Sequence, residues 1–284
     1  MNALSNQRLL AYLTVLSIVF ICSGCAQDVN GSVHSLSYDK IDMDEVRAGR
    51  DIHKEIVQQI YPYQNVEVNN YVRQIGKKLI SYVERDNLPY QFTILYDQRI
   101  YATAAPGGFI YITTGMINFV DNESQLAAVL AHELGRVQSK SPQTEETKKF
   151  FNTLSQTGQA VGPMFGNYGT LAAVGLQLLG AYMSVDPPAI DKIVLADKLA
   201  LDYLAQASYD PQGLIDFLYK ISQSETDEHT LLYHYLVSHE ISVDRMKLLD
   251  RYFEQLPIRG QSFNVNRDYF NRITEPVRKL YSTE

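Results

Sequence analysis

Apolar residues recur at helical spacing over most of the chain. In residues 66–83, for example, Val72 and Ile75 fall on one face of the expected helix. Residues 90–96 and 109–113 are instead rich in β-forming residues and predict paired strands. Further helices are expected over residues 43–60, 122–138, 148–157, 170–184, 189–206, 211–223, 231–236, 242–254 and 268–281. The pattern indicates an α+β domain that is mostly helical, with a small sheet near its N-terminal third.

A run of small residues separates the two expected strands. Residues 102–106 are expected to be extended, and Gly107 and Gly108 to break the chain before the second strand. After that strand, Asn122 is a predicted helix N-cap, because Gln125 follows three residues later in a capping-box arrangement. The sequence therefore predicts where that helix begins.

The segment 158–185 is rich in glycine and apolar residues and has almost no charge. It is interrupted too often to predict a membrane-spanning helix. Two interpretations stay open. The segment is either a core helix with a buried loop, or a mobile and partly exposed piece that forms a lid or contacts a membrane surface.

The start of the chain resembles an export signal. One cation, Arg8, precedes an apolar run over residues 9–22, which is shorter than the roughly 20 residues that a spanning helix needs. Small residues then lead to Cys25, as in the lipobox of bacterial lipoproteins, although Cys22 stands where Leu is usual. We therefore predict a lipoprotein signal peptide over residues 1–24, with lipid on the Cys25 thiol. An ordinary signal peptide cut nearby and an uncleaved anchor are the alternatives.

Lipidation at Cys25 would decide where the chain resides. Several acyl chains on one cysteine anchor a protein firmly, and Ala26 follows without the Asp that suggests retention in the inner membrane. The expected location is therefore the bacterial cell envelope, at the periplasmic face of the outer membrane. The polar residues 25–40 are predicted to be a tether, and residues 41–284 a single domain.

Composition and charge mainly exclude classes of protein. The chain is 45% hydrophobic and 20% charged, which is ordinary for a globular protein and excludes a polytopic membrane protein. Its 2 cysteines both lie in the signal region, so the folded part would have no disulfide. The net charge is −7 and no basic stretch offsets it, so we expect no nucleic-acid partner.

Candidate chemistry lies on the helix over residues 122–138, where Glu133 follows His132. In the H-E-x-x-H signature of zinc proteases, two histidines on one helical face bind one metal ion, and the glutamate deprotonates the metal-bound water. In this chain the position of the second histidine holds Arg136. A His-Glu pair alone says little, so its meaning depends on the rest of the sequence.

Four blocks, in the same order and spacing, resemble the HtpX-like and BepA-like (Oma-type) membrane-associated zinc metallopeptidases. They are residues 102–115 with Pro-Gly-Gly, 122–137 with His-Glu, 196–211 with Ala-Asp and Tyr-Asp-Pro, and 238–245 with Ser-His and Arg245. The resemblance implies a zincin-like metallopeptidase domain, in which a small sheet has an edge strand before the active-site helix. It also implies that substrate binds at this edge, at Ala104, Pro106, Gly107 and Gly108.

The same resemblance implies a set of zinc ligands, from which the chain departs. The first ligand falls on His132 and the general base on Glu133, but the second histidine falls on Arg136 and the glutamate ligand on Ile193. A catalytic zinc needs three nitrogen or oxygen ligands and a water, and a guanidinium is charged at every relevant pH. We therefore expect a degenerate site without a cofactor, in which Glu133 is vestigial.

Other positions of the family pattern are partly kept. The aspartate near the third ligand is present as Asp197 and the late histidine as His239, although Glu240 replaces the proline that usually follows. In the edge block, the usual Asn is Tyr101 and the usual Phe is Thr103.

Two hypotheses describe the environment of Arg136. In the first, its guanidinium fills the metal cavity and pairs with Glu133 and Asp197, while Ile193 fills the remaining volume. In the second, Glu133 and Arg136 are an exposed pair of helix neighbours that contributes about 0.2–0.5 kcal/mol.

Three functions remain open from the sequence. The leading one is an envelope lipoprotein with a degenerate metallopeptidase domain that does not cut. It would bind extended peptides, unfolded envelope proteins or a partner protease in envelope protein quality control. The second is an active metalloendopeptidase with a rearranged zinc site of His132 and His239, completed by Asp197 or Asp191. The third is a structural lipoprotein that uses its helices as an assembly surface.

Overall fold

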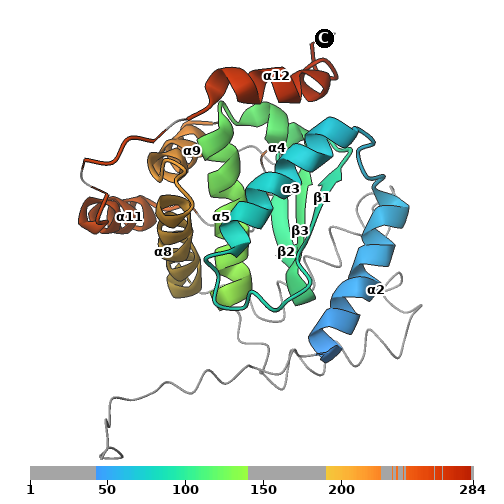
Figure 1. Cartoon of the computed structure of the whole chain (residues 1–284), viewed down its shortest axis with the longest axis horizontal. Helices are drawn as coiled ribbons and strands as arrows, with labels where there is room; N and C mark the ends of the chain where they lie inside the picture. Colours follow the sequence, from blue (N-terminus) through green and yellow to red (C-terminus); the bar gives the residue numbers. More distant parts are fainter. Residues whose placement is uncertain are drawn as a thin grey trace, which may run out of the picture. The chain divides into compact units, whose positions relative to one another are not determined.

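The computed structural model describes residues 43–139, 190–224 and 241–282 without 259 and 264, together with Leu232, Tyr235 and His239. These residues belong to the unit Ile41–Glu284. Figure 1 shows the elements, which are, in chain order, α2 (Met43–Gln59), α3 (Val66–Ile80), β1 (Gln91–Leu95), β2 (Ala102–Ala105), the 3-10 turn η1 (Pro106–Gly108), β3 (Phe109–Thr113), α4 (Thr114–Phe119), α5 (Glu123–Ser139), α8 (Ile190–Gln206), α9 (Gln212–Ser222), α11 (Val243–Gln255) and α12 (Arg267–Arg278).

The described strands form one mixed three-stranded sheet in the order β1-β3-β2. β1 runs parallel to β3, with Gln91 opposite Phe109, and β2 runs antiparallel to β3, with Ala105 opposite the same residue. The two expected strands and the expected extended segment are confirmed. Gly107 and Gly108 turn the chain between β2 and β3 at φ values of 72° and 87°, which residues with a side chain rarely adopt.

α5 is the centre of the described fold. Every residue of this helix from Glu123 to Val137 is buried. The helix packs against α8, α9 and β2, and Figure 1 shows it between the sheet and α8. The predicted N-cap is confirmed, because Asn122 Oδ1 accepts a hydrogen bond from the backbone N–H of Gln125 at 3.0 Å. A helix that is buried all round places its polar side chains in the core as well as its apolar ones.

The structure adds one helix, and it ends two others, α3 and α12, three residues before their predicted ends at residues 83 and 281. α4 is missing from the sequence-based prediction, because its 6 residues are too few to show a helical period. Thr113 begins it by accepting a hydrogen bond from the N–H of Met116 at 3.1 Å. α3 ends at Ile80, before the predicted end at residue 83, and two turn hydrogen bonds follow it.

Several predictions lie outside the described residues. These are the signal peptide 1–24, the lipidation site Cys25, the tether 25–40, the helices 148–157 and 170–184, and the segment 158–185. Of the helix predicted over 231–236, only Leu232 and Tyr235 are described, and both are buried. Within the described parts of the chain, no helix combines the length and the apolar character needed to cross a membrane.

Candidate functional site

Buried polar side chains from three helices meet around α5. This polar cluster consists of His132, Glu133 and Arg136 from α5, Asp197 from α8, Arg245 from α11, and His239. Each of these side chains is at most 3% exposed. α5 and α8 can approach this closely because Gly135 has no side chain, since a Cβ there would lie 2.5 Å from the backbone oxygen of Ala196. Buried charges need partners, so the contacts within the polar cluster decide what it can do.

One half of the polar cluster is centred on Asp197. Arg245 donates to both of its oxygens, from Nε to Oδ2 at 2.7 Å and from Nη2 to Oδ1 at 2.9 Å. The Nδ1 of His132 lies 2.7 Å from Oδ1. Burial alone would raise the pKa of Asp197, but the charge of Arg245 and the hydrogen bond from His132 outweigh it and lower the pKa to about 2. The ionised carboxylate therefore keeps the proton of His132 on Nδ1.

The second ring nitrogen of His132 is left open. Its Nε2 has no hydrogen-bond partner within the described part of the chain. An imidazole that is held by a carboxylate through one nitrogen, with the other available, has the arrangement of a metal-ligating histidine. The donor atoms of His132, Glu133 and His239 all lie within 4.8 Å of one another, so these residues could hold a metal ion.

The other half of the polar cluster is centred on Glu133. Its Oε1 lies 2.8 Å from His239 Nε2, and its Oε2 lies 3.4 Å from Arg136 Nη1. Burial alone would raise the pKa of Glu133, but the charge of Arg136 and contact with His239 lower it to about 2. Burial, together with the charge of Arg136, lowers the pKa of His239 to about 3. At neutral pH, this half therefore joins a carboxylate, a guanidinium and a neutral imidazole.

The hydrogen bonds of His239 cannot all be satisfied at once. Its Nδ1 lies 3.1 Å from the backbone oxygen of Tyr235, which can only accept, so Nδ1 carries the proton. Nε2 is then an acceptor, which suits the Arg136 Nη1 at 2.8 Å. However, the Glu133 oxygen at the same nitrogen is an acceptor too. Two lone pairs face each other at this point, and the nearby guanidinium supplies the positive charge that offsets them.

The structure separates the two hypotheses for Arg136. Its 3% exposure means that the exposed helix-surface pair was the wrong expectation. The contact with Glu133 is present, but the expected pairing with Asp197 is wrong, because Arg245 and His132 hold both oxygens of that carboxylate. The sequence placed Arg245 in the late block without giving it a role. Its only signal was its position shortly after His239.

Two α8 residues that the sequence singled out differ in burial. Ile193 is 3% exposed, so an apolar side chain lies in the core where the resemblance places a zinc ligand. Asp191 is exposed and is not part of the buried polar cluster.

The residues expected to form a substrate edge lie on β2 and η1. Ala104, Pro106, Gly107 and Gly108 are all buried. β2 is an outer strand of the described sheet and packs against α5. Thr103, at the centre of β2, has a buried hydroxyl without a hydrogen-bond partner in the described residues.

Comparison with known proteins gives one family and several relatives. The sequence model of peptidase family M48 matches residues 67–252, a range that includes the whole polar cluster. The chain is 24% identical to the beta-barrel assembly-enhancing protease of Yersinia pestis over 159 residues, which are 55% of this chain and 33% of that protein. The protein of the same name from Escherichia coli (strain K12) is 24% identical over 158 residues, 54% of this chain and 32% of the relative.

A eukaryotic relative matches over a similar length. The chain is 26% identical to the mitochondrial metalloendopeptidase OMA1 of Arabidopsis thaliana over 166 residues, which are 58% of this chain and 32% of that protein. The matched part of the chain therefore spans about a third of the length of these curated relatives.

Proposed function

The chain belongs to peptidase family M48, and from this premise we propose that it is an envelope lipoprotein whose peptidase domain binds proteins without cutting them. The observation that carries the proposal is the buried guanidinium of Arg136, 2.8 Å from His239 Nε2 and 3.4 Å from Glu133 Oε2. It contacts two of the three residues that could hold a metal ion. The protein is in this view a pseudoprotease.

A zinc ion, which family members usually use, does not fit beside this guanidinium. The hydrogen bond from Arg136 uses the lone pair that His239 would give to a metal. The guanidinium also keeps its charge at every relevant pH and would repel a dication a few ångströms away. Ile193 offers only carbon at the position of the family's glutamate ligand. Without a metal, Glu133 has no polarised water to deprotonate, so we propose that it serves as the partner of Arg136.

Protein binding can persist where the chemistry is lost. An outer strand can accept an extended peptide by backbone hydrogen bonds, and we place this edge at β2 and η1, around Ala104, Pro106, Gly107 and Gly108. The clients would be unfolded envelope proteins or a partner protease. The bacterial relatives carry names that refer to the assembly of β-barrels, which is the reason for proposing envelope protein quality control. Lipid on Cys25 would hold the domain at the periplasmic face of the outer membrane.

A second candidate function rests on specific contacts. His132, Glu133 and His239 lie within 4.8 Å of one another, and the Nε2 of His132 is open. If Arg136 adopted another rotamer, these groups could ligate zinc, and the protein would be an active metalloendopeptidase with a rearranged site.

The deciding experiment is elemental analysis of the purified chain prepared without chelator, together with a casein-cleavage assay. We expect zinc near zero per chain and no cleavage. Zinc near one per chain would overturn the pseudoprotease. In that case His239→Ala should release the metal, whereas His53→Ala, a histidine on α2 outside the polar cluster, should not.

A further inference from the structure

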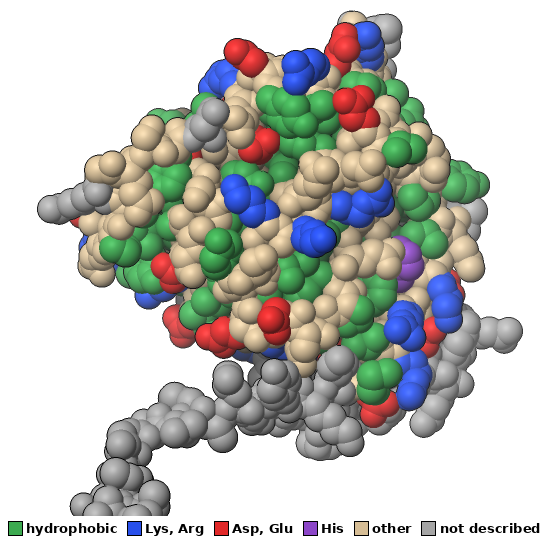
Figure 2. Space-filling model, viewed as in Figure 1, with side chains coloured by type: hydrophobic (Ala, Val, Ile, Leu, Met, Phe, Trp, Pro, Cys, Tyr) green, Lys and Arg blue, Asp and Glu red, His purple; other side chains and the backbone are tan. Residues whose placement is uncertain are grey.

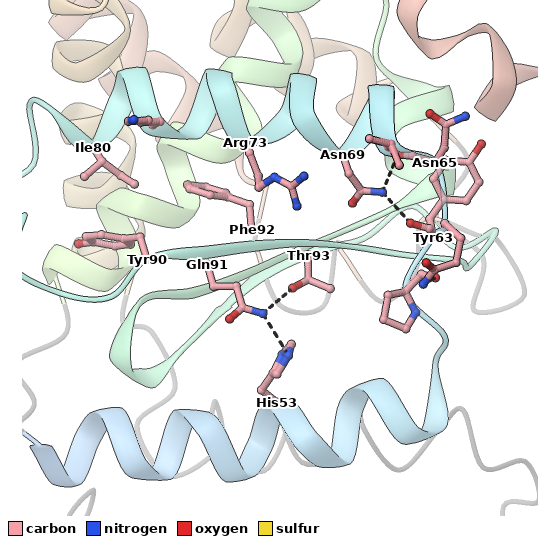
Figure 3. A pocket seen from close by; sticks show the side chains of 14 residues that line it. His53, Tyr63, Asn65, Asn69, Arg73, Ile80, Tyr90, Gln91, Phe92 and Thr93 are labelled. Atoms are coloured by element: carbon pink, nitrogen blue, oxygen red, sulfur yellow. Dashed lines mark hydrogen bonds between the residues drawn. The ribbon is translucent and has the colours of Figure 1, made fainter.

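A groove in the described part of the chain lies at the edge of the sheet formed by β1, opposite the edge formed by β2. A cavity of about 640 Å³ runs along the outer edge of β1, with α3 as one wall and α2 as the other. Figure 3 shows Phe92 and Arg73 toward the α3 wall, and Gln91, Thr93 and His53 toward the α2 wall. We call this cavity the β1 groove. It is a different surface from the polar cluster and from the β2 edge.

Part of the outer edge of β1 is already paired. The Ile94 carbonyl accepts a hydrogen bond from the N–H of Tyr63 at 2.8 Å, and the N–H of Tyr96 donates to the Tyr61 carbonyl at 2.9 Å. These bonds show which residues of β1 direct their backbone groups outward. Because the backbone of a strand alternates with period two, the N–H and C=O of Phe92 point to the same outer side as those of Ile94.

The segment that pairs with β1 through Tyr61 and Tyr63 leaves the strand edge before it reaches Phe92. Asn65 caps the start of α3, and Asn69 Nδ2 donates a hydrogen bond to the carbonyl of Tyr63 at 2.6 Å. The chain therefore turns into a helix where a continued strand would have paired with Phe92. The backbone N–H and C=O of Phe92 are left facing the β1 groove in the described structure, and an unpaired strand edge is a template for a further strand.

The charge of the β1 groove is opposite to that of the whole chain. Arg73 and Lys77 line it from exposed positions on α3, and none of the described lining residues is Asp or Glu. Neither cation forms an ion pair among the described residues; Arg73 donates only to the neutral side chain of Asn70, at 2.5 Å. Figure 2 shows Lys and Arg side chains gathered over α3. In a chain of net charge −7, this local positive wall favours an anionic ligand.

We propose that the β1 groove binds an extended peptide with acidic side chains at alternate positions, which adds to the sheet as a strand beside β1. Backbone hydrogen bonds to Phe92 would set its register. Alternate side chains of an added strand point to one face of the sheet, so every second residue would face α3, where its carboxylate meets Arg73 or Lys77. The intervening side chains would face the α2 wall at His53.

The test uses a short fluorescein-labelled peptide in which Glu alternates with Thr or Val, and a matched peptide with Lys in place of each Glu. Binding to the full chain is measured by fluorescence anisotropy at low and high salt. The double variant Arg73→Glu/Lys77→Glu should weaken binding at least about tenfold. Lys78→Glu is the matched control, because this neighbouring lysine on α3 does not line the β1 groove; it should leave binding within about twofold.

Hydrogen exchange at Phe92 tests strand addition separately from charge. The N–H of Phe92 should exchange more slowly once the Glu peptide is bound, and the Lys peptide should not protect it. Equal binding of both peptides, unchanged binding to the double variant, or an unprotected Phe92 amide would overturn the proposal. So would an amide that is already protected in the free chain, since another segment of the chain would then occupy the edge. Protection that rises with protein concentration alone would show that a second copy is the occupant, and would overturn it too.

Discussion

The two halves of the polar cluster are built from the same kinds of side chain, but only one of them is consistent as a hydrogen-bond network. Around Asp197, every contact joins a donor to an acceptor, from Arg245 on one side and His132 on the other. Around Glu133, one nitrogen of His239 faces both a donor on Arg136 and an acceptor on Glu133. His132 belongs to both halves: its Nδ1 is bonded in the first, and its Nε2 has no hydrogen-bond partner among the described residues in the second.

The difference separates two roles in a metallopeptidase domain. The Asp197 half orients a histidine and ties α5, α8 and α11 together, which it does whether or not a metal is present. The Glu133 half contains Glu133 and His239, which with His132 could hold a metal ion, and Arg136 contacts both of them. The contacts around Asp197 thus pair each donor with an acceptor and link three helices, while the possible metal ligands around Glu133 have a guanidinium among them.

Removing Arg245 should have the largest effect on the free energy of unfolding. In Arg245→Met, the carboxylate of Asp197 stays buried with the hydrogen bond from His132 as its remaining contact in the polar cluster, so we expect the free energy of unfolding to fall by about 3–5 kcal/mol. Urea unfolding followed by circular dichroism measures it. Arg251→Met removes an exposed arginine from the same helix and should cost no more than about 0.5 kcal/mol. A loss below about 1 kcal/mol in Arg245→Met would contradict a structural role for this half.

Restoring the family ligands should convert the second half into a zinc site. In Arg136→His/Ile193→Glu, zinc at a hundred times its dissociation constant should stabilise the fold by about 2.7 kcal/mol, seen as a higher unfolding temperature. The original chain should not respond to the same zinc concentration. A response of the original chain would mean that Arg136 gives way to the metal, and the two halves would then not differ as described.

Removing Arg136 alone should lower the free energy of unfolding by less than removing Arg245 does. In Arg136→Met, the Glu133 carboxylate keeps His239 within 2.8 Å and can share a proton with it, so we expect a loss of about 1–3 kcal/mol in the same urea experiment. The comparison with Arg245→Met is the measurement that matters. If Arg136→Met proves as costly as Arg245→Met, the Glu133 half is as important to the fold as the Asp197 half.

Much of the frame around the polar cluster could be predicted from the sequence. Local periodicity gave α2, α3, α5 and the strands, and the capping arrangement at Asn122 gave the start of α5, because these features depend on near neighbours in the chain. The family membership, which the match over residues 67–252 shows, followed from blocks whose order and spacing can be read along the chain. The short helix α4 was missed because it has too few residues to show a period.

What only the tertiary structure decided is which side chains become partners. Arg245 lies 48 residues from Asp197, and His239 lies 103 residues from Arg136, so no local pattern could pair them. Those pairs depend on how α8 and α11 pack against α5, and the sequence-based pairing of Arg136 with Asp197 failed for that reason. The β1 groove likewise exists only because α2 and α3 stand on either side of a strand edge. The sequence by itself determined the family and most of the described elements, since both depend on local spacing along the chain. The choice of partners and the open strand edge arise from long-range packing, which local spacing does not encode.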